Sequence, residues 1–242
     1  MAGVANEVAF VWRRSDFRES SRIVTLLSRT KGKVRALAKG AHRQNSPLLG
    51  RLDHLNLVEA TLAGRGDLKL LSRCKLIEDR RRLREPRRFL AASWLVELVD
   101  VALPEGRAEP ELFDLVQGGL HLLELCPSAS LGTIVLGLEL RFLASQGLLP
   151  PLDTCALCAQ PAESLAADQR SLRCAQHHEP GGQRPAPGVL PWLCNLEKTL
   201  GRGWPDLPAC AEPRSAERIV GGFVALALER KPRLRRHALD SR

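Results

Sequence analysis

The 242-residue sequence contains no tyrosine and no long uncharged run. Its longest stretch without Asp, Glu, Lys or Arg is the 14 residues from Leu125 to Leu138, shorter than the about 20 apolar residues of a membrane-spanning helix. The N-terminal segment MAGVANEVAFVWRR places its charges after its apolar stretch, so we expect no secretory signal. The seven cysteines are odd in number and unevenly spread, which argues against a secreted disulfide scaffold. We therefore expect a cytoplasmic protein without a membrane partner.

Motifs of common catalytic sites are also missing. The sequence has no GxxxxGK[ST] phosphate loop and no HExxH, GxSxG or GxGxxG motif. His177-His178-Glu179 spells the H-x-E of zinc deaminases, but those enzymes carry a P-C-x-x-C pair after it. Here the C-x-x-C pair lies upstream and follows Thr154. We therefore expect no enzyme.

Positive charge is concentrated in the first third of the chain. The whole chain has 36 Lys and Arg against 27 Asp and Glu, a formal net charge of +9. Residues 1–88 hold 21 and 9 of these, a net charge of +12, whereas residues 89–226 carry −7 and the tail 227–242 carries +4. Such asymmetry indicates a dedicated basic module that attracts a polyanion. The tail is typical of a disordered, solvated terminus.

The basic block reads as five short strands at regular spacing. We expect these strands over residues 8–12, 23–27, 34–38, 54–62 and 68–75. A Lys-Gly turn joins the second strand to the third, and the stretch Ala63–Asp67 joins the fourth to the fifth, so the strands should be antiparallel. Five strands fit a small barrel such as the OB-fold, although periodicity alone does not distinguish it from other small barrels.

Helical spacing begins at Pro86, and Leu90, Trp94, Leu98 and Val101 share one helix face. We expect helices over 87–103, 110–125, 131–146, 189–201 and 214–230, with Gly118-Gly119 costing the second about 1 kcal/mol each. The predicted fold class is α+β and multidomain. An OB-fold domain, 1–80, precedes an all-α domain, 81–150 and 188–242, into which a zinc-finger-like module, 151–187, is inserted.

The module carries a metal-ligand pattern. Cys155 and Cys158 are followed after fifteen residues by Cys174 and His177, in the pattern C-x2-C-x15-C-x2-H. Each pair can hold one side of a tetrahedral ion, and three thiolates with one imidazole fill its coordination shell. The pattern predicts one structural Zn²⁺. His177 is favoured as fourth ligand by the equal spacing of the two pairs, with His178 as the alternative.

Basic residues alternate on two of the predicted strands. Lys33, Arg35 and Lys39 share one face of the third strand, and Arg43 follows in the next loop. Lys69, Arg73 and Lys75 have the same parity on the fifth strand. If these faces adjoin, they form a track for a phosphate backbone; otherwise they are simply a solvated outer surface. The predicted DNA-binding residues are Lys33, Arg35, Lys39, Arg43, Lys69 and Arg73.

Aromatic side chains for base stacking are scarce in this block, which has only Phe10, Trp12 and Phe17. Base stacking in single-strand binding depends largely on aromatic rings. We therefore expect contact mainly with phosphates, weak sequence preference and strong salt dependence.

Four segments of the sequence carry a resemblance to a known protein family. They are FRESSRIVTLLSRTKGKVRALAKGAHR, LVEATLAGRGDLKLLSRCKLIED, WLVELVDVALPEGRAEPELFDLV and LELRFLASQGLLPPLDTCALC. Taken together they resemble the RecO family of bacterial DNA repair and recombination mediators, over about the first 180 residues. The resemblance implies an OB-fold, a helical domain and a zinc module. It assigns a DNA-binding role to Lys33, Arg35, Lys39 and Arg43, and metal ligation to Cys155, Cys158 and Cys174. His177 stands where the family usually has a fourth Cys, and Ala159 stands where it has Gly.

The resemblance also implies a function. Members bind single- and double-stranded DNA, anneal complementary strands and help RecR to load the RecA recombinase onto strands coated by single-strand-binding protein. Expected partners are RecR and the acidic C-terminal tail of that coating protein, in the cytoplasm and, during repair, at the nucleoid. Alternatively, the chain is a protein-interaction adaptor, with DNA contact secondary. Its helical domain would then bind an acidic peptide beside Arg141 or the tail arginines Arg233, Arg235 and Arg236.

Overall fold

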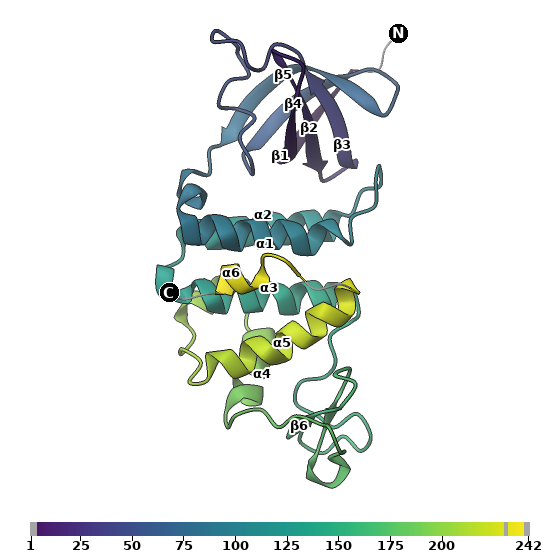
Figure 1. Cartoon of the computed structure of the whole chain (residues 1–242), viewed down its shortest axis with the longest axis vertical. Coiled ribbons are helices and arrows are strands. Elements are labelled where there is room, and N and C mark those ends of the chain that lie inside the picture. The colour runs from purple at the N-terminus through teal and green to yellow at the C-terminus, as the bar shows by residue number, and fades with distance from the viewer. Residues whose placement is uncertain (1–3, 230–231, 240–242) are drawn as a thin grey trace. The chain divides into compact units, whose positions relative to one another are not determined.

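The protein, seen here as a computed structural model that describes residues 4–229 and 232–239, divides into two compact units (Figure 1). The first unit contains the chain up to Arg84 together with Asp100–Asp114. The second contains Glu85–Val99 and the chain from Leu115 onward. The chain therefore passes between the two units three times.

The first unit is built on a closed five-stranded barrel of the OB type (Figure 1). Its strands are β1 (Val4–Phe17), β2 (Ser21–Ser28), β3 (Gly32–Ala38), β4 (Leu57–Ala63) and β5 (Leu68–Glu78). They follow the order β1-β2-β3-β5-β4 around the barrel. Both predicted hairpins, β2–β3 and β4–β5, are confirmed as antiparallel pairs. The predicted barrel is thus confirmed, with strands that extend beyond the predicted ones at most of their ends.

One strand pair corrects the expectation of an entirely antiparallel barrel. β3 pairs with β5 in parallel, with Arg35 opposite Leu68 and Leu37 opposite Leu70. Directions cannot alternate all the way around a closed ring of five strands, so at least one neighbouring pair must be parallel. Short links between consecutive strands say nothing about this closing pair, because β3 and β5 are separated by β4 in the sequence.

The barrel interior is apolar, with one buried carboxylate at its margin. Glu7 is 8% exposed and accepts hydrogen bonds of 2.6 Å from Ser28 Oγ and from Thr30 Oγ1. Lys31 Nζ lies 2.9 Å from its other oxygen. Burial raises the pKa of the Glu7 carboxyl, but the hydrogen bonds from Ser28, Thr30 and Lys31 outweigh burial and hold the pKa below its ordinary value.

The segment Asp100–Asp114 packs on the barrel within the same unit. Trp12 Nε1 donates to Asp100 Oδ1 at 2.8 Å, and the rings of Phe10 and Phe113 lie 5.2 Å apart. Arg29 makes a two-bond ion pair with Asp114, with both distances 2.9 Å. Phe10 and Trp12 are consequently fully buried, so neither ring is available to a ligand.

The second unit is helical. Its α-helices are α1 (Pro86–Asp100), α2 (Pro110–Leu125), α3 (Leu131–Ser145), α4 (Val189–Lys198), α5 (Pro213–Leu228) and α6 (Arg235–Leu239), the first residues of α2 and the last of α1 belonging to the barrel unit. Short 3₁₀ helices are η2 (Ser128–Ser130), η3 (Ala175–His177) and η4 (Gly201–Asp206), while η1 (Arg81–Arg84) belongs to the barrel unit. The five predicted helices are confirmed, but α1 ends before Val101, which is exposed. The expected fourth apolar position of that helix is therefore wrong.

Helix α3 forms the centre of the helical unit and packs against α4, α5 and α6 (Figure 1). Ser128–Ser145 is long and apolar enough, by length and composition, to cross a membrane. Most of this segment is buried inside the protein, as in the core helix of a globular unit. Its Glu139 is fully buried and accepts hydrogen bonds from Trp94 Nε1 and from Nε and Nη2 of Arg235, each at 2.8 Å.

The adjacent glycines of α2 have different environments. A Cβ atom on Gly119 would lie 2.8 Å from Leu95 of α1 and 2.9 Å from Leu138 of α3, whereas a Cβ on Gly118 would meet nothing within 4 Å. Gly119 thus lets two neighbouring helices approach α2. Gly118 carries only the entropic cost of glycine in a helix.

Alanine substitutions should separate these two roles. Gly118→Ala should raise the free energy of unfolding by about 0.5–1 kcal/mol, because it restricts the unfolded chain and favours helix. Gly119→Ala should lower it by about 1 kcal/mol, because the leucine methyl groups must repack. Urea unfolding followed by circular dichroism measures both changes. Equal effects of the two substitutions would contradict the packing role of Gly119.

Replacing Glu7 should have a pH-dependent effect. Because its folded pKa is lowered, the carboxylate stabilises the fold above its unfolded pKa, and this contribution is lost as pH falls through the folded pKa. Glu7→Gln should therefore cost about 1–2 kcal/mol at pH 7, and the difference from the wild type should shrink toward pH 3. Urea unfolding across this range tests it, and a gap independent of pH would contradict it.

Candidate nucleic-acid interface and metal centre

A basic groove lies between the loop after β3 and strand β5. This groove, groove A, has a volume of about 680 Å³ and is lined by twelve residues. Its cationic members are Lys39, Arg43, Arg51 and Arg73. None of the described residues that line it is acidic. Three of the predicted DNA-binding residues are thus brought together, and Arg51 joins them.

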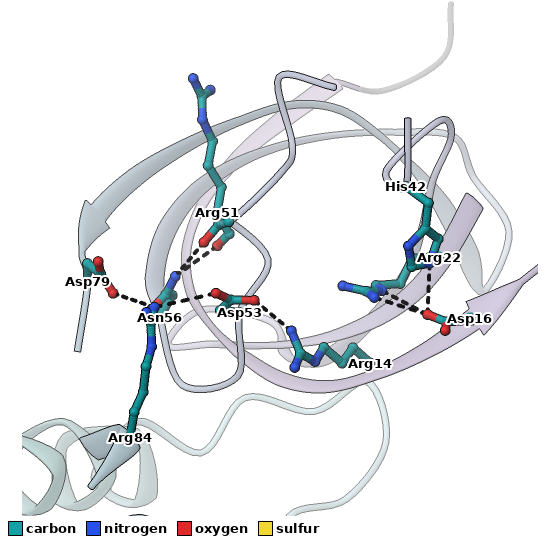
Figure 2. A network of polar contacts seen from close by, with 10 residues as sticks. Arg14, Asp16, Arg22, His42, Arg51, Asp53, Asn56, Asp79 and Arg84 are labelled. Carbon is teal, nitrogen blue, oxygen red and sulfur yellow. Dashed lines mark hydrogen bonds and ion pairs between the residues drawn. The ribbon is translucent and has the colours of Figure 1, made fainter. Parts of the chain in front are cut away.

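Polar contacts hold the loop that carries Arg43 and Arg51 in place (Figure 2). At one end, Asp16 lies 2.8 Å from His42 Nε2 and 3.1 Å from Arg22. Hydrogen bonds from Arg22 and His42 hold the pKa of the Asp16 carboxyl below its ordinary value. The loop therefore starts from a point tied to β1 and β2.

The other end of this loop is tied as well (Figure 2). Asp53 accepts a 2.7 Å hydrogen bond from Arg14 of β1, and Asn56 Nδ2 donates to the carbonyl oxygens of Gly50 and Arg51. Arg51 Nη1 itself donates to the Cys74 carbonyl of β5 at 2.6 Å. This contact places the guanidinium against the strand that forms the other side of groove A.

A second basic groove, groove B, lies at the opposite end of β3 and has a volume of about 750 Å³. It contains the cations Lys31, Lys33, Arg35, Arg65 and Lys69, together with the carboxylates Asp67 and Glu105. The Lys33 side chain is only 11% exposed, and its Nζ lies 3.5 Å from Asp100 and 3.9 Å from Glu105. The charge of Lys33 is therefore largely neutralised within the protein, whereas Arg35 is exposed.

The structure corrects one part of the predicted track. Lys69 and Arg73 have the same parity in the sequence, but they lie on opposite faces of β5. The register shifts between Thr61 and Leu62, which pair with Arg73 and Leu71, so Ser72 is the extra residue of a β-bulge. A bulge reverses the alternation beyond it. Lys69 consequently lines groove B on the face of the buried Leu71, and Arg73 points outward to groove A.

The Cys/His cluster is assembled in the segment between α3 and α4. The ligand atoms of Cys155, Cys158, Cys174 and His177 all lie within 4.8 Å of one another, so the cluster can hold a metal ion. His177 Nδ1 lies 3.7 Å from Cys155 Sγ and 3.4 Å from Cys174 Sγ. The neighbouring His178 instead places its Nδ1 3.1 Å from Ser164 Oγ.

Two tight turns and a small hairpin position these ligands. In the first turn, Ala159 N donates to Cys155 O at 3.0 Å, and Ala159 has a left-handed φ of 58°, where glycine is favoured. In the second, η3 brings His177 N to Cys174 O. Strands β6 (Ser164–Leu165) and β7 (Leu172–Arg173) join the two turns.

The environment of Cys155 favours a thiolate. Burial opposes ionisation, but the backbone N–H groups of Leu157, Cys174 and Cys158 and the ring of His177 lower the pKa of this thiol to about 6. Metals bind the thiolate form of cysteine, so this sulfur is suited to metal ligation at neutral pH.

Comparisons with known proteins agree with both halves of the fold. The family model described as Recombination protein O N terminal matches residues 1–80, and Recombination protein O C terminal matches residues 83–236. The chain belongs to the RecO family. A relative from Syntrophobacter fumaroxidans, named DNA repair protein RecO, is 33% identical over 175 residues, which are 70% of this chain and 69% of the relative. One from Bacillus cereus with the same name is 30% identical over 172 residues, 70% of this chain and 68% of the relative.

Some basic residues of this RecO-family barrel were missed by parity along the strands. Arg51 lies in a loop of eighteen residues between β3 and β4, where alternation has no meaning. Lys31 and Arg65 lie in the two hairpin turns. The positions of Lys31 and Arg65 in the sequence could have indicated them, because their two turns flank the strands that carry Arg35 and Lys69.

Two of the arginines proposed for an acidic peptide, Arg141 and Arg235, make side-chain hydrogen bonds within the helical unit. Arg141 Nη2 donates to the Thr199 carbonyl at 2.9 Å, and Arg235 forms the buried pair with Glu139. The backbone N–H of Arg233 donates to Glu97 at 3.1 Å. Arg236 is exposed, and the remaining basic tail residues, 230, 231 and 242, lie outside the described residues. Of the expected peptide-binding arginines, Arg235 is thus already paired, Arg141 is partly engaged, and Arg233 and Arg236 stay exposed.

Substituting the two adjacent histidines should distinguish their roles. His177→Ala should reduce the metal content of the purified protein or weaken metal retention, because it removes one of four converging ligand atoms. His178→Ala should leave metal content unchanged, because its ring faces Ser164. Elemental analysis after dialysis measures both. Loss of metal in the His178 variant alone would contradict this assignment.

Proposed function

We propose that this RecO-family chain is a non-enzymatic DNA-binding mediator of recombinational DNA repair. It binds single- and double-stranded DNA, anneals complementary strands and assists RecA loading, together with RecR, on strands coated by single-strand-binding protein. Residues 1–80 act as the DNA-binding domain, 81–150 with 188–242 as a helical domain, and 151–187 as a zinc module. Family membership and the names of the relatives support the repair role.

The observation that carries the DNA-binding part is groove A. Lys39, Arg43, Arg51 and Arg73 converge there, and no carboxylate is among its described lining residues. A positively charged groove on a small barrel follows a phosphate backbone. Phosphate oxygens would accept hydrogen bonds from these side chains and displace counterions from the strand. The anchored loop reduces the entropy that binding must remove, because its ends are already fixed.

Groove B would extend the contact along β3, from Arg35 in groove B to Lys39, the first residue after the strand, in groove A. At about 3.3 Å per residue these two residues are roughly 13 Å apart along the strand. We assign Arg35 and Lys69 to this second contact. Lys33 would contribute less than sequence parity suggests, because Asp100 and Glu105 already neutralise it.

The donor set of the Cys/His cluster fits one structural zinc ion. In a tetrahedral site with sulfur ligands at about 2.3 Å, neighbouring ligand atoms lie about 3.8 Å apart. The Cys158 and Cys174 sulfurs lie 3.6 Å apart, close to that value. Cys155, Cys158, Cys174 and His177 would hold the ion, and bound Zn²⁺ would cross-link the two turns. With four protein ligands no position remains for a substrate.

Annealing and partner binding require more than the barrel. Neutralising phosphates lowers the repulsion between two strands, so a basic protein can bring complementary strands together. We assign RecR and the acidic C-terminal tail of single-strand-binding protein as partners in the cytoplasm, at the nucleoid during repair. The family resemblance supports these partners.

Neutralising groove A should weaken DNA binding and lower its salt dependence. The double variant Lys39→Gln/Arg73→Gln should bind a single-stranded oligonucleotide more weakly than the wild type. The slope of log affinity against log salt should fall by about 0.7 per lost phosphate contact. Fluorescence anisotropy at several salt concentrations measures both quantities, and the rate of annealing of complementary oligonucleotides should fall in parallel.

Lys75→Gln provides the matched control. Lys75 is an exposed lysine of the same strand, and it lines neither groove. This variant should keep wild-type affinity and nearly the wild-type salt slope. The proposal fails if the wild type shows no salt-sensitive complex with DNA, or if the groove A variant and the Lys75 variant bind equally.

A further inference from the structure

An apolar row crosses the outer surface of the barrel between the two basic grooves. Leu37 of β3 lies directly opposite Leu70 of β5 in the parallel pair. The row continues through Ala63 of β4 to Val4 of β1. Leu70 is 37% exposed and Val4 is 67% exposed. Leu68 has the same outward parity as Leu70 on β5 and is 43% exposed.

The position of this row relative to the charges is specific. Along β3 and the residue that follows it, Leu37 lies between Arg35 of groove B and Lys39 of groove A. On β5, Leu70 is the last outward residue before the bulge and Arg73 of groove A is the next basic outward residue, whereas Lys69 reaches groove B from the opposite face. A strand that follows the outer surface from Arg35 of groove B to Lys39 of groove A therefore passes over Leu37 and its partner Leu70. Only a ligand with apolar surface between its charges gains from this arrangement.

The β-bulge at Ser72 is the reason that the outward side chains of β5 change from apolar to basic. Before the bulge, the outward positions of β5 are Leu68 and Leu70; beyond it, Arg73 is outward. Without the bulge, Lys69 and Arg73 would share a face, as sequence parity predicts. Moreover, Phe10 and Trp12, two of the three aromatic residues before Arg88, are fully buried. The exposed apolar surface between the grooves is thus aliphatic.

We propose that Leu37, Leu68 and Leu70 form an aliphatic platform for the bases of single-stranded nucleic acid whose phosphates occupy grooves A and B. This inference rests on the proposed DNA-binding function and names the form of DNA that the site prefers. The faces of unpaired bases are largely apolar and lose water against the leucine side chains. All bases offer such a face, so the platform discriminates little between sequences.

The platform distinguishes single strands from duplexes. In a duplex the bases are stacked on one another and paired, and their faces cannot reach the leucines. Duplex DNA would use the basic side chains alone. A protein with this surface favours an unpaired strand over a duplex by the contribution of the base contacts.

Oligonucleotides with and without bases test the platform. The wild type should bind a single strand of thymidines more tightly than an equally long strand of abasic residues. Leu70→Thr keeps a strand-forming residue and should weaken binding to the thymidine strand about five-fold, from the loss of partly buried apolar surface. It should leave binding to the abasic strand and to a duplex unchanged. Leu70→Phe should bind the thymidine strand more tightly, which misfolding cannot cause.

Ile77→Thr is the matched control, because Ile77 is an exposed aliphatic residue of β5 (45%) that lines neither groove. It should bind all three probes as the wild type does. Equal binding of thymidine and abasic strands by the wild type, or equal losses on both by Leu70→Thr, would overturn the platform. If Lys39→Gln/Arg73→Gln still weakened binding, the proposed function would stand without it. Absence of any DNA complex would overturn both.

Discussion

Closure of a barrel from an odd number of strands is the constraint on which the rest of the first unit depends. Five strands cannot alternate in direction around a ring, and the pair that resolves the conflict is β3 with β5. This pairing joins the two strands that carry most of the outward basic residues. It also creates the two grooves at its ends and sets Leu37 beside Leu70 between them. A barrel closed by another pair would have dispersed the same residues.

Ion pairing then determines which cations can meet a ligand. Several cations of the barrel unit are already paired with carboxylates: Lys33 with Asp100 and Glu105, Lys31 with Glu7, and Arg29 with Asp114. These contacts stabilise the barrel unit, and they reduce the charge that groove B presents. Groove A carries its cations without a lining carboxylate. The net charge of +12 over 88 residues therefore overstates the positive charge at any one surface, because several of the cations form ion pairs within the fold.

The helical unit uses charge differently. Glu139, fully buried in an otherwise apolar helix, is paired with Arg235 and bonded to Trp94. Removing either partner would leave a buried charge uncompensated, which is costly. Glu97 receives the backbone N–H groups of Arg233 and Leu234 before α6. The described part of the basic tail is therefore a docked element of the helical unit, not the disordered terminus that its composition indicates.

Local patterns in the sequence determined the strands, the helices and the ligand spacing of the Cys/His cluster, because each depends on residues close together in the chain. The barrel class and the order of barrel, helices and cluster followed from them. The alternation of side chains predicted from the sequence failed at Ser72, where one extra residue in β5 reverses the side chains that follow it. It also made no prediction for the loop that carries Arg51. Only the tertiary structure decided which strands close the barrel, which cations are neutralised and which aromatic rings are buried. Those outcomes depend on contacts between distant segments, such as Lys33 with Asp100 and Phe10 with Phe113, whose partners no local pattern identifies.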